Sequence, residues 1–184
     1  MKILLHTCCG PCSIYPIEEL SKEYAVSAYF FNPNIHPFQE FKRRKNSLRE
    51  YCEKNRIPII DLGSYGMKEF LRKVVFHENT RCNVCYSWRM EETAKRAAED
   101  GFEAFTTTLL YSRYQNHDKL RQCGTELAEK YGISFIYKDF REGWQYGIDK
   151  SIELGMYRQP YCGCIYSEQE RYDKLLRKKN NTTK

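Results

Sequence analysis

Nine cysteines in a chain of 184 residues are the side chains best suited to chemistry. Seven of them stand in three short motifs: Cys8, Cys9 and Cys12 in HTCCGPCS, Cys82 and Cys85 in RCNVCY, and Cys162 and Cys164 in YCGC. Glycine, proline or asparagine accompanies each motif, so the backbone can turn and bring neighbouring sulfurs together. The other two, Cys52 and Cys123, lie alone in amphipathic segments, and we interpret them as packing residues.

Three kinds of site fit these motifs. An iron–sulfur cluster takes four thiolates, which leaves three of the seven for redox chemistry or a second metal. A structural zinc site can use the pairs Cys9/Cys12 and Cys82/Cys85, although the separation is far beyond the ~15–20 residues of ribbon-type sites. A thioredoxin-like dithiol fits CGPC, but it leaves the two distant motifs unused.

The segments around the motifs alternate between strand-like and helix-like patterns. Short runs rich in apolar and β-branched residues predict strands at 2–7, 25–33, 57–62, 104–110 and 134–140. Amphipathic segments predict helices at 17–24, with Pro16 in a first-turn position, and at 37–55, 85–100 and 117–131. Ser167 and Glu170 form a capping-box pattern that predicts the start of a last helix.

This alternation predicts an α/β fold in which a parallel sheet is flanked by helices on both faces. The pattern continues without a linker, so we expect a single domain over residues 1–178 and a solvated tail at 179–184. In such sheets the ligand site lies at the carboxyl ends of the strands. Cys8, Cys9 and Cys12 come directly after the first strand, which predicts a metal site at that edge.

Composition and hydropathy exclude several classes of protein. Hydrophobic residues make up 41% of the chain and aromatic residues 15%, enough for a core, so the chain is not disordered overall. The apolar runs, such as KILLH and AVSAYFF, are far shorter than the ~18 residues of a membrane-spanning helix. MKILLH begins like a signal peptide, but its apolar run is too short. We therefore expect the reducing cytoplasm, where clustered thiols favour metal or redox roles.

Basic residues are concentrated in one segment. The chain has a net charge of +6, and residues 42–56 hold seven basic and two acidic side chains, including Lys42, Arg43 and Arg44. Such a block favours a polyanion such as RNA, and a solvated helix face is the alternative. Aromatic side chains near the basic loops can stack on unpaired bases, and the candidates are Phe38, Tyr111, Tyr114 and Tyr157.

Taken together, the motifs resemble one family. LLHTCCGPCS, FFNPNIHPFQEFKRR, the segment from RCNVCYSW to TTTLLYSRYQNH, KDFREGWQYG and SIELGMYRQPYCGCIYS are similar to the QueH type of epoxyqueuosine reductase. The resemblance covers residues 3–167. It implies a Rossmann-type fold related to the HUP nucleotide-binding superfamily, and an oxidoreductase that completes queuosine synthesis on tRNA.

The resemblance also implies a reaction and a set of site residues. Epoxyqueuosine at the wobble position of tRNAs with GUN anticodons is reduced to the alkene, with release of water and without cobalamin. The family pattern places the ligands of a [4Fe-4S] cluster at Cys8, Cys9, Cys82 and Cys85, and redox-active cysteines at Cys162 and Cys164. No motif identifies the electron donor or the oligomeric state.

The electron count of that reaction bears on the remaining cysteines. Removal of the epoxide oxygen takes two electrons and two protons, whereas a cluster passes single electrons. Cys162 and Cys164 supply two electrons if they close to a disulfide. In a second hypothesis, Cys12, Cys162 and Cys164 hold an additional iron that acts as a Lewis acid toward the epoxide oxygen. Candidate proton donors or phosphate contacts near these motifs are Asp139, Arg141 and Arg158.

Two other functions fit parts of the sequence. An ATP-dependent tRNA-modifying enzyme, such as an iron–sulfur thiolase, shares the predicted fold, but HTCCGPCS stands where its phosphate-binding SGG-x-DS loop belongs. A zinc-stabilised RNA-binding module uses the same cysteines and basic segment without catalysis. Metal content separates these hypotheses, because the reductase requires iron and the RNA-binding module requires zinc.

Overall fold

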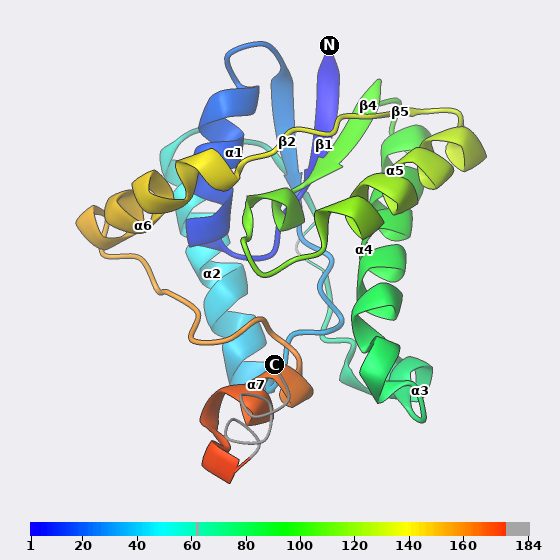
Figure 1. Ribbon diagram of the computed structural model, residues 1–184. Coiled ribbons are helices and arrows are strands. Elements are labelled where there is room, and N and C mark those ends of the chain that lie inside the picture. Colours follow the sequence, from blue (N-terminus) through cyan, green and yellow to red (C-terminus); the bar gives the residue numbers. More distant parts are fainter. Residues whose placement is uncertain (62, 176–184) are drawn as a thin grey trace.

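The structure is a computed structural model that describes residues 1–61 and 63–175 (Figure 1). Within these residues, parallel strands form one sheet: β1 (Lys2–His6), β2 (Ala25–Tyr29), β3 (Ile59–Asp61), β4 (Ala104–Thr107) and β5 (Ser134–Phe135). The strand order is β3-β2-β1-β4-β5, so the direction of winding reverses between β1 and β4. This Rossmann-type order confirms the predicted α/β fold.

Helices cover both faces of the sheet. α1 (Gly10–Leu20), α2 (Phe38–Lys54) and α6 (Trp144–Glu153) lie on one side, and α4 (Arg81–Glu99) and α5 (His117–Tyr131) on the other (Figure 1). Two short helices, α3 (Met67–Val74) and α7 (Ile165–Tyr172), lie beyond the carboxyl ends of the strands. Turns of 3-10 helix occupy Glu78–Thr80, Thr108–Tyr111 and Arg141–Gly143.

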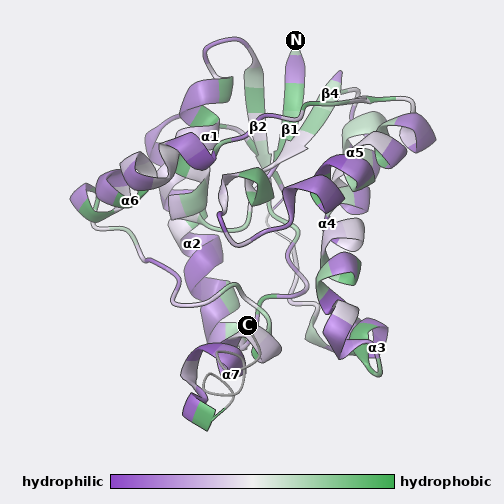
Figure 2. Ribbon diagram, viewed as in Figure 1, coloured by the Kyte–Doolittle hydropathy of each residue, from purple (hydrophilic) through white to green (hydrophobic). Residues whose placement is uncertain are grey.

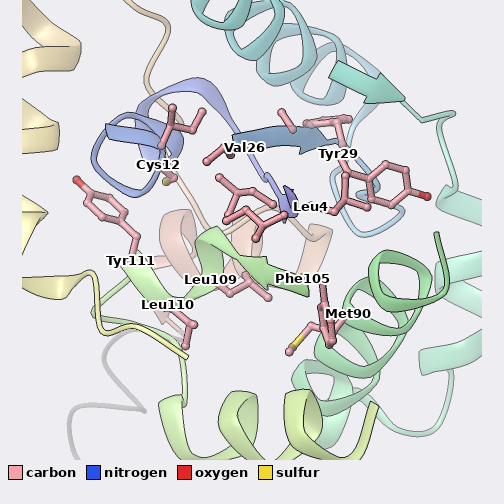
Figure 3. Close-up of a cluster of buried hydrophobic side chains, with 14 of the residues drawn as sticks. Leu4, Cys12, Val26, Tyr29, Met90, Phe105, Leu109, Leu110 and Tyr111 are labelled. Carbon is pink, nitrogen blue, oxygen red and sulfur yellow. The ribbon is translucent and has the colours of Figure 1, made fainter. Parts of the chain in front are cut away.

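The central strands are apolar along most of their length because both faces of the sheet are covered. Ile3, Leu4 and Leu5 of β1 have no exposed surface. Figure 3 shows Leu4 and Phe105 of the sheet near Met90 of α4, within the main buried cluster. Hydrophobic colours follow the strands in Figure 2, and hydrophilic colours dominate the outer turns of the helices.

The strand register brings the ends of β1 and β4 to the same level. His6 lies opposite Tyr29 of β2 and Thr107 of β4. Because the strands are parallel, the residues that follow β1 and β4 leave the sheet at one edge. This edge therefore receives the first cysteine motif together with the threonine run that starts at Thr106.

The helices that carry cysteines begin earlier than their patterns predict. α1 starts at Gly10 rather than at residue 17, because Pro11 takes a first-turn position where its missing N–H removes no hydrogen bond. Pro16 consequently lies inside the helix. α4 starts at Arg81 rather than at residue 85. The first two turns of α1 therefore contain Cys12, and the first two turns of α4 contain Cys82 and Cys85.

Other boundaries also differ from the prediction. The strand predicted at 104–110 ends at Thr107 and continues as a 3-10 turn. The predicted capping box is wrong, because α7 starts at Ile165 with Cys164 as its N-cap. Ser167 instead donates its hydroxyl to the Cys164 carbonyl at 2.7 Å from inside the helix. Neither α3 nor α6 has a counterpart among the predicted helices.

The described elements share one main buried cluster, and a smaller one contains Phe70, Val74 and Cys164. The predicted tail at 179–184 lies outside the described residues, as do the last residues of the predicted domain. In the described part of the chain, no helix has the length and apolar character needed to cross a membrane.

Candidate active site

Cys8, Cys9 and Cys12 form a triad at the carboxyl end of β1. Their sulfur atoms all lie within 4.8 Å of one another, and the Cys8 and Cys9 sulfurs are 3.8 Å apart. Within residues 1–61 and 63–175, no other three histidine, cysteine or acidic side chains converge in this way. Cysteine sulfur is a soft ligand for zinc, copper(I) and iron–sulfur clusters, so the triad can hold such a metal.

Backbone and side-chain contacts from distant segments position the triad. Cys9 is the N-cap of α1, which places Cys12 near the start of that helix. The Cys8 N–H donates to Thr108 Oγ1 at 3.2 Å, and the Thr108 hydroxyl in turn faces the Cys8 sulfur at 3.5 Å. Gln159 Nε2 donates to the Cys12 sulfur at 2.9 Å. The triad is therefore supported by β1, by the end of β4 and by the segment before α7.

Two glycines permit the close packing of the cysteine segments. A Cβ atom on Gly10 would lie 2.8 Å from the carbonyl oxygen of Ser47 on α2, too close for any side chain. Gly163 has a φ of 152°, which side chains disfavour, and a Cβ atom there would lie 3.1 Å from Asn34 Nδ2. Glycine at both positions lets the cysteine motifs approach α2 and the segment after β2.

The triad is an electrostatically coupled group. Hydrogen bonds from the Cys12 and Cys9 thiols hold the pKa of Cys8 well below its usual range, and Arg89 and Thr108 act in the same direction. The hydrogen bond to Cys8 correspondingly raises the pKa of Cys12, and burial raises the pKa of Cys9. Cys8 therefore has the lowest pKa of the three thiols, and the other two sulfurs are its hydrogen-bond partners.

The other four motif cysteines form a second group. Cys82 and Cys85 lie in the first two turns of α4, Cys162 lies in the segment before α7, and Cys164 is the α7 N-cap. Burial raises the pKa of Cys85 to about 12 and also raises that of Cys82, and the nearby Cys162 and Cys164 sulfurs add to both shifts. All these cysteines are free thiols in the structure.

The triad differs from the predicted ligand set, which is Cys8, Cys9, Cys82 and Cys85. Cys12 is the third member of the triad, whereas Cys82 and Cys85 belong to the second group. The four-ligand assignment stays a prediction. Cys52 is buried and Cys123 is partly buried against the main core, in keeping with their interpretation as packing residues.

A cavity of about 590 Å³ opens at this edge of the sheet. Cys8 and Cys12 of the triad line it together with Cys162 of the second group. Its volume lies within the ~300–1,000 Å³ typical of small-molecule sites. The wall also presents cationic, aromatic and amide side chains, among them Arg89, Arg158, Tyr111, Trp144, Gln115 and Gln159.

Arg89 lies between the two cysteine groups, and sequence reasoning missed it. It stands four residues after Cys85 on α4 and is 2% exposed. Its Nη1 donates to the Cys85 sulfur at 3.5 Å, its Nη2 to Asn32 Oδ1 at 2.7 Å, and its Nε to His6 Nε2 at 3.3 Å. The i, i+4 spacing from a motif cysteine is the signal that identifies such a residue in the sequence.

His6 and Asn32 connect Arg89 to the sheet. His6 Nδ1 lies 2.9 Å from Thr107 Oγ1, and Asn32 Nδ2 donates to the Thr7 carbonyl at 2.8 Å. Burial, reinforced by the positive charge of Arg89, lowers the pKa of His6 to about 3. The imidazole is therefore neutral near pH 7, and its Nε2 lies 3.3 Å from Arg89 Nε and 3.1 Å from the Phe31 carbonyl oxygen.

Arg44 is not a surface residue, although the sequence predicts it as an RNA contact. It is 1% exposed, and its Nε donates to Glu40 at 2.6 Å. Its two Nη atoms donate to the carbonyls of Tyr161 and Cys162, each at 2.8 Å. Burial removes Arg44 from the candidate RNA contacts, because its N–H groups are directed at the chain itself. It supports the segment that carries Cys162.

The other predicted RNA contacts are accessible. Lys42 and Arg43 are exposed on α2, and Arg158 is exposed at the cavity. The Arg43 guanidinium lies over the Tyr157 ring, 5.6 Å from its centroid. These side chains provide positive charge next to the cavity and along α2.

Aromatic side chains form a rim at the cavity, which we call the aromatic rim and define as Tyr114 and Trp144. Tyr114 is 84% exposed and meets Trp144 edge to face, with ring centroids 5.8 Å apart. Tyr111 is stacked on the same Trp144 at 5.2 Å but is 3% exposed, and Figure 3 shows it beside Cys12. Of the predicted stacking residues, Tyr114 presents the largest free surface at the cavity.

Comparison with known proteins identifies the family. The family model described as "Epoxyqueuosine reductase QueH" matches residues 3–170. An epoxyqueuosine reductase QueH from Dehalococcoides mccartyi is 37% identical over 174 residues, which cover 94% of this chain and 96% of that protein. The protein of the same name from Thermotoga maritima is 34% identical over 182 residues, which cover 94% and 93% of the two chains.

A solved structure gives a further comparison of fold. A predicted subunit of a tRNA methyltransferase from Methanocaldococcus jannaschii superposes with a TM-score of 0.56 and 11% sequence identity, covering 83% of this chain and 76% of that one. This likeness extends the Rossmann-type assignment and concerns the fold alone. The family match includes all three cysteine motifs, and the chain belongs to the QueH family of epoxyqueuosine reductases.

Proposed function

We propose that this chain reduces epoxyqueuosine to queuosine in tRNA, as a cytoplasmic oxidoreductase. The observation that carries the proposal is the cavity at the carboxyl edge of the sheet, where thiols of both cysteine groups meet in a member of the QueH family. Its substrate is tRNA with epoxyqueuosine at the wobble position of GUN anticodons. The reaction is the last step of queuosine synthesis.

The donor atoms at this edge fit an iron–sulfur cluster. We assign Cys8, Cys9, Cys82 and Cys85 as the ligands of a [4Fe-4S] cluster. All four are thiols, the usual ligands of such a cluster, and they come from the start of α1 and the start of α4. Arg89 between the two groups supplies positive charge. When bound, such a cluster would supply electrons one at a time.

Cys162 and Cys164 match the electron count of the reaction. Conversion of an epoxide to an alkene consumes two electrons and two protons, and the oxygen leaves as water. Oxidation of two thiols to one disulfide releases two electrons and two protons, so this pair balances the reaction. The Cys162 sulfur accepts a hydrogen bond from Gln115 Nε2 at 3.5 Å at the cavity wall. In the alternative role, Cys12 joins the pair as ligands of an additional iron.

The surroundings of the cavity suit an unpaired nucleotide. Bases in single-stranded RNA stack on exposed aromatic rings, and the aromatic rim offers one such surface. Arg158 beside the rim, and Lys42 and Arg43 on α2, are assigned to backbone phosphates. The modified base then enters the cavity from the anticodon loop.

Anaerobic metal analysis combined with a turnover assay tests the proposal. The purified protein is analysed for iron, sulfide and zinc, and is then mixed with epoxyqueuosine-containing tRNA and a chemical reductant. We expect about four or more iron atoms per chain and conversion of the nucleoside to queuosine. A protein that carries one zinc, lacks iron and leaves the tRNA unchanged contradicts the proposal.

Single cysteine variants test the assigned roles. Cys82→Ala should lose the cluster, while Cys162→Ala should keep it and lose turnover. Cys123→Ala is the matched control, because this cysteine packs against the core away from both groups. Full iron content in Cys82→Ala would remove Cys82 from the ligand set, and normal turnover in Cys162→Ala would remove it from the mechanism.

A further inference from the structure

Arg89 is a buried cation whose hydrogen-bond partners carry no carboxylate. It is 2% exposed and donates to a histidine nitrogen of His6, an amide oxygen of Asn32 and the sulfur of Cys85. Among the described residues, Arg89 forms no ion pair with an aspartate or glutamate. The imidazole and the amide that hold the guanidinium therefore leave its charge unneutralised.

A buried guanidinium without a negative partner destabilises a fold by several kcal/mol. Arg44 shows the usual solution, since Glu40 lies 2.6 Å from it. The groups near Arg89 that can carry negative charge are sulfurs. The Cys85 sulfur is in contact, and Cys8 and Cys162 lie within electrostatic range and line the same cavity.

We propose that Arg89 is the counter-charge of the metal-bound thiolates and sets the reduction potential of the group that they hold. The inference rests on the proposed function, because cysteine keeps its negative charge when it is a metal ligand. Arg89 is a positioning residue in this scheme and does not contact the substrate. His6 and Asn32 hold its guanidinium at a fixed place beside Cys85.

The charge of Arg89 predicts the direction in which the midpoint potential changes when the arginine is replaced. Uptake of an electron makes a thiolate-ligated group more negative, and a fixed cation nearby stabilises the reduced form more than the oxidised form. Loss of the cation therefore makes reduction harder and moves the midpoint potential to more negative values. A residue that acts only through packing leaves the potential unchanged even where stability falls.

Anaerobic potentiometric titration of the iron-loaded protein tests this sign. We expect Arg89→Met to shift the midpoint potential to more negative values. Arg89→Gln, which keeps donors but lacks charge, should shift it in the same way. Arg89→Lys should retain most of the wild-type value because it keeps the charge. Arg96→Gln is the matched control, since Arg96 lies about two turns further along α4 and bonds Asp100 at the surface. Its potential should equal that of the wild type.

The outcomes separate this inference from the proposed function. Iron-loaded Arg89→Met with the wild-type potential overturns the inference and leaves the function standing. Wild-type protein that takes up no iron overturns both, because the anion assigned to Arg89 is then missing. If neither Arg89→Met nor Arg89→Gln folds, Arg89→Lys is the variant that tests the inference. A folded Lys variant with the wild-type potential supports a need for charge, and one that does not fold shows that guanidinium shape is required and overturns the inference.

Discussion

Two buried arginines line the cavity, and their partners differ. Arg44 on α2 stands four residues after Glu40, and Arg89 on α4 stands four residues after Cys85. The same helical spacing thus joins one guanidinium to a carboxylate and the other to a sulfur. Arg44 pairs with Glu40, holds the carbonyls of residues 161 and 162, and also lies within electrostatic range of the triad. Arg89 has no carboxylate partner among the described residues, and only cysteine sulfurs face it as groups that can carry negative charge.

This comparison shows that the partner, and not the depth of burial, decides what a buried cation does. The Glu40–Arg44 pair is complete within the fold, so its contribution is the geometry of the Cys162 segment. Arg89 has an incomplete charge balance within the fold, so its contribution is electrostatic. Substitutions at these two positions should therefore affect different properties of the protein.

The largest expected effect on stability comes from breaking the complete pair. Glu40→Gln should lower the free energy of unfolding by about 3–5 kcal/mol, because it leaves the Arg44 charge buried without a partner. Arg44→Met should have an effect of similar size, and the double variant should lose less than the sum of the two. Urea unfolding measures all three. A loss well under 1 kcal/mol for Glu40→Gln would show that Arg44 is neutralised elsewhere.

Arg44→Lys should separate geometry from charge. An ammonium group cannot bond both backbone carbonyls as the guanidinium fork does, so the Cys162 segment should lose its placement. We expect turnover to fall about 100-fold, while iron content and midpoint potential stay at the wild-type values. Activity assays and potentiometry on the same sample check this split. A shift in midpoint potential as large as that of Arg89→Met would show that Arg44 also acts through its charge.

Asn32→Ala should weaken the placement of Arg89 without removing its charge. The variant deletes the amide oxygen that accepts from Arg89 Nη2 at 2.7 Å. Hydrogen bonds to charged groups contribute about 1.5–3 kcal/mol, so urea unfolding should show a loss in that range. The midpoint potential should move less than in Arg89→Met. A shift equal to that of Arg89→Met would mean that position matters as much as charge.

The smallest effect is expected at the surface. Arg96 and Asp100 have the same i, i+4 spacing and the same 2.6 Å contact as Glu40 and Arg44, but their side chains are 36% and 32% exposed. Arg96→Gln should therefore cost less than about 0.5 kcal/mol in urea unfolding. A loss comparable to that of Glu40→Gln would indicate that spacing, and not burial, determines the worth of such pairs.

Helices with clear capping residues at both ends could be predicted from the sequence. α5 runs from His117 to Tyr131 as predicted, because Asn116 accepts from the Lys119 N–H and Gly132 takes a left-handed φ of 62°. Helices α3 and α6 have glycine at the N-cap, Gly66 and Gly143, so no side chain at these positions can accept a hydrogen bond from the first turn. These two helices therefore lack the start signal that marks α5, although Phe70 and Val74 of α3 are buried and stand at helical spacing.

Only part of the candidate site could be predicted from the sequence. The motif cysteines and their sheet edge follow from spacing, but the membership of Cys12 in the triad depends on where α1 begins. Because Arg44 stands in the basic run on α2, the sequence predicts it as an RNA contact and not as a buried residue. Phe41, Arg44, Leu48 and Tyr51 recur at intervals of three and four residues and are all buried, so helical periodicity places Arg44 on the inner face. Its partners on residues 161 and 162 depend on tertiary folding.

The segment between α6 and α7 has a consequence for the timing of assembly. It supplies Arg158, Gln159 and Cys162 to the cavity wall, whereas the triad is made near the other end of the chain. At ~5–20 residues per second, roughly 8–30 s of synthesis separate the two. During that interval the nascent sulfurs face the cell without their cover. The cavity wall beside the triad is therefore complete only after residues 158–162 have been synthesised.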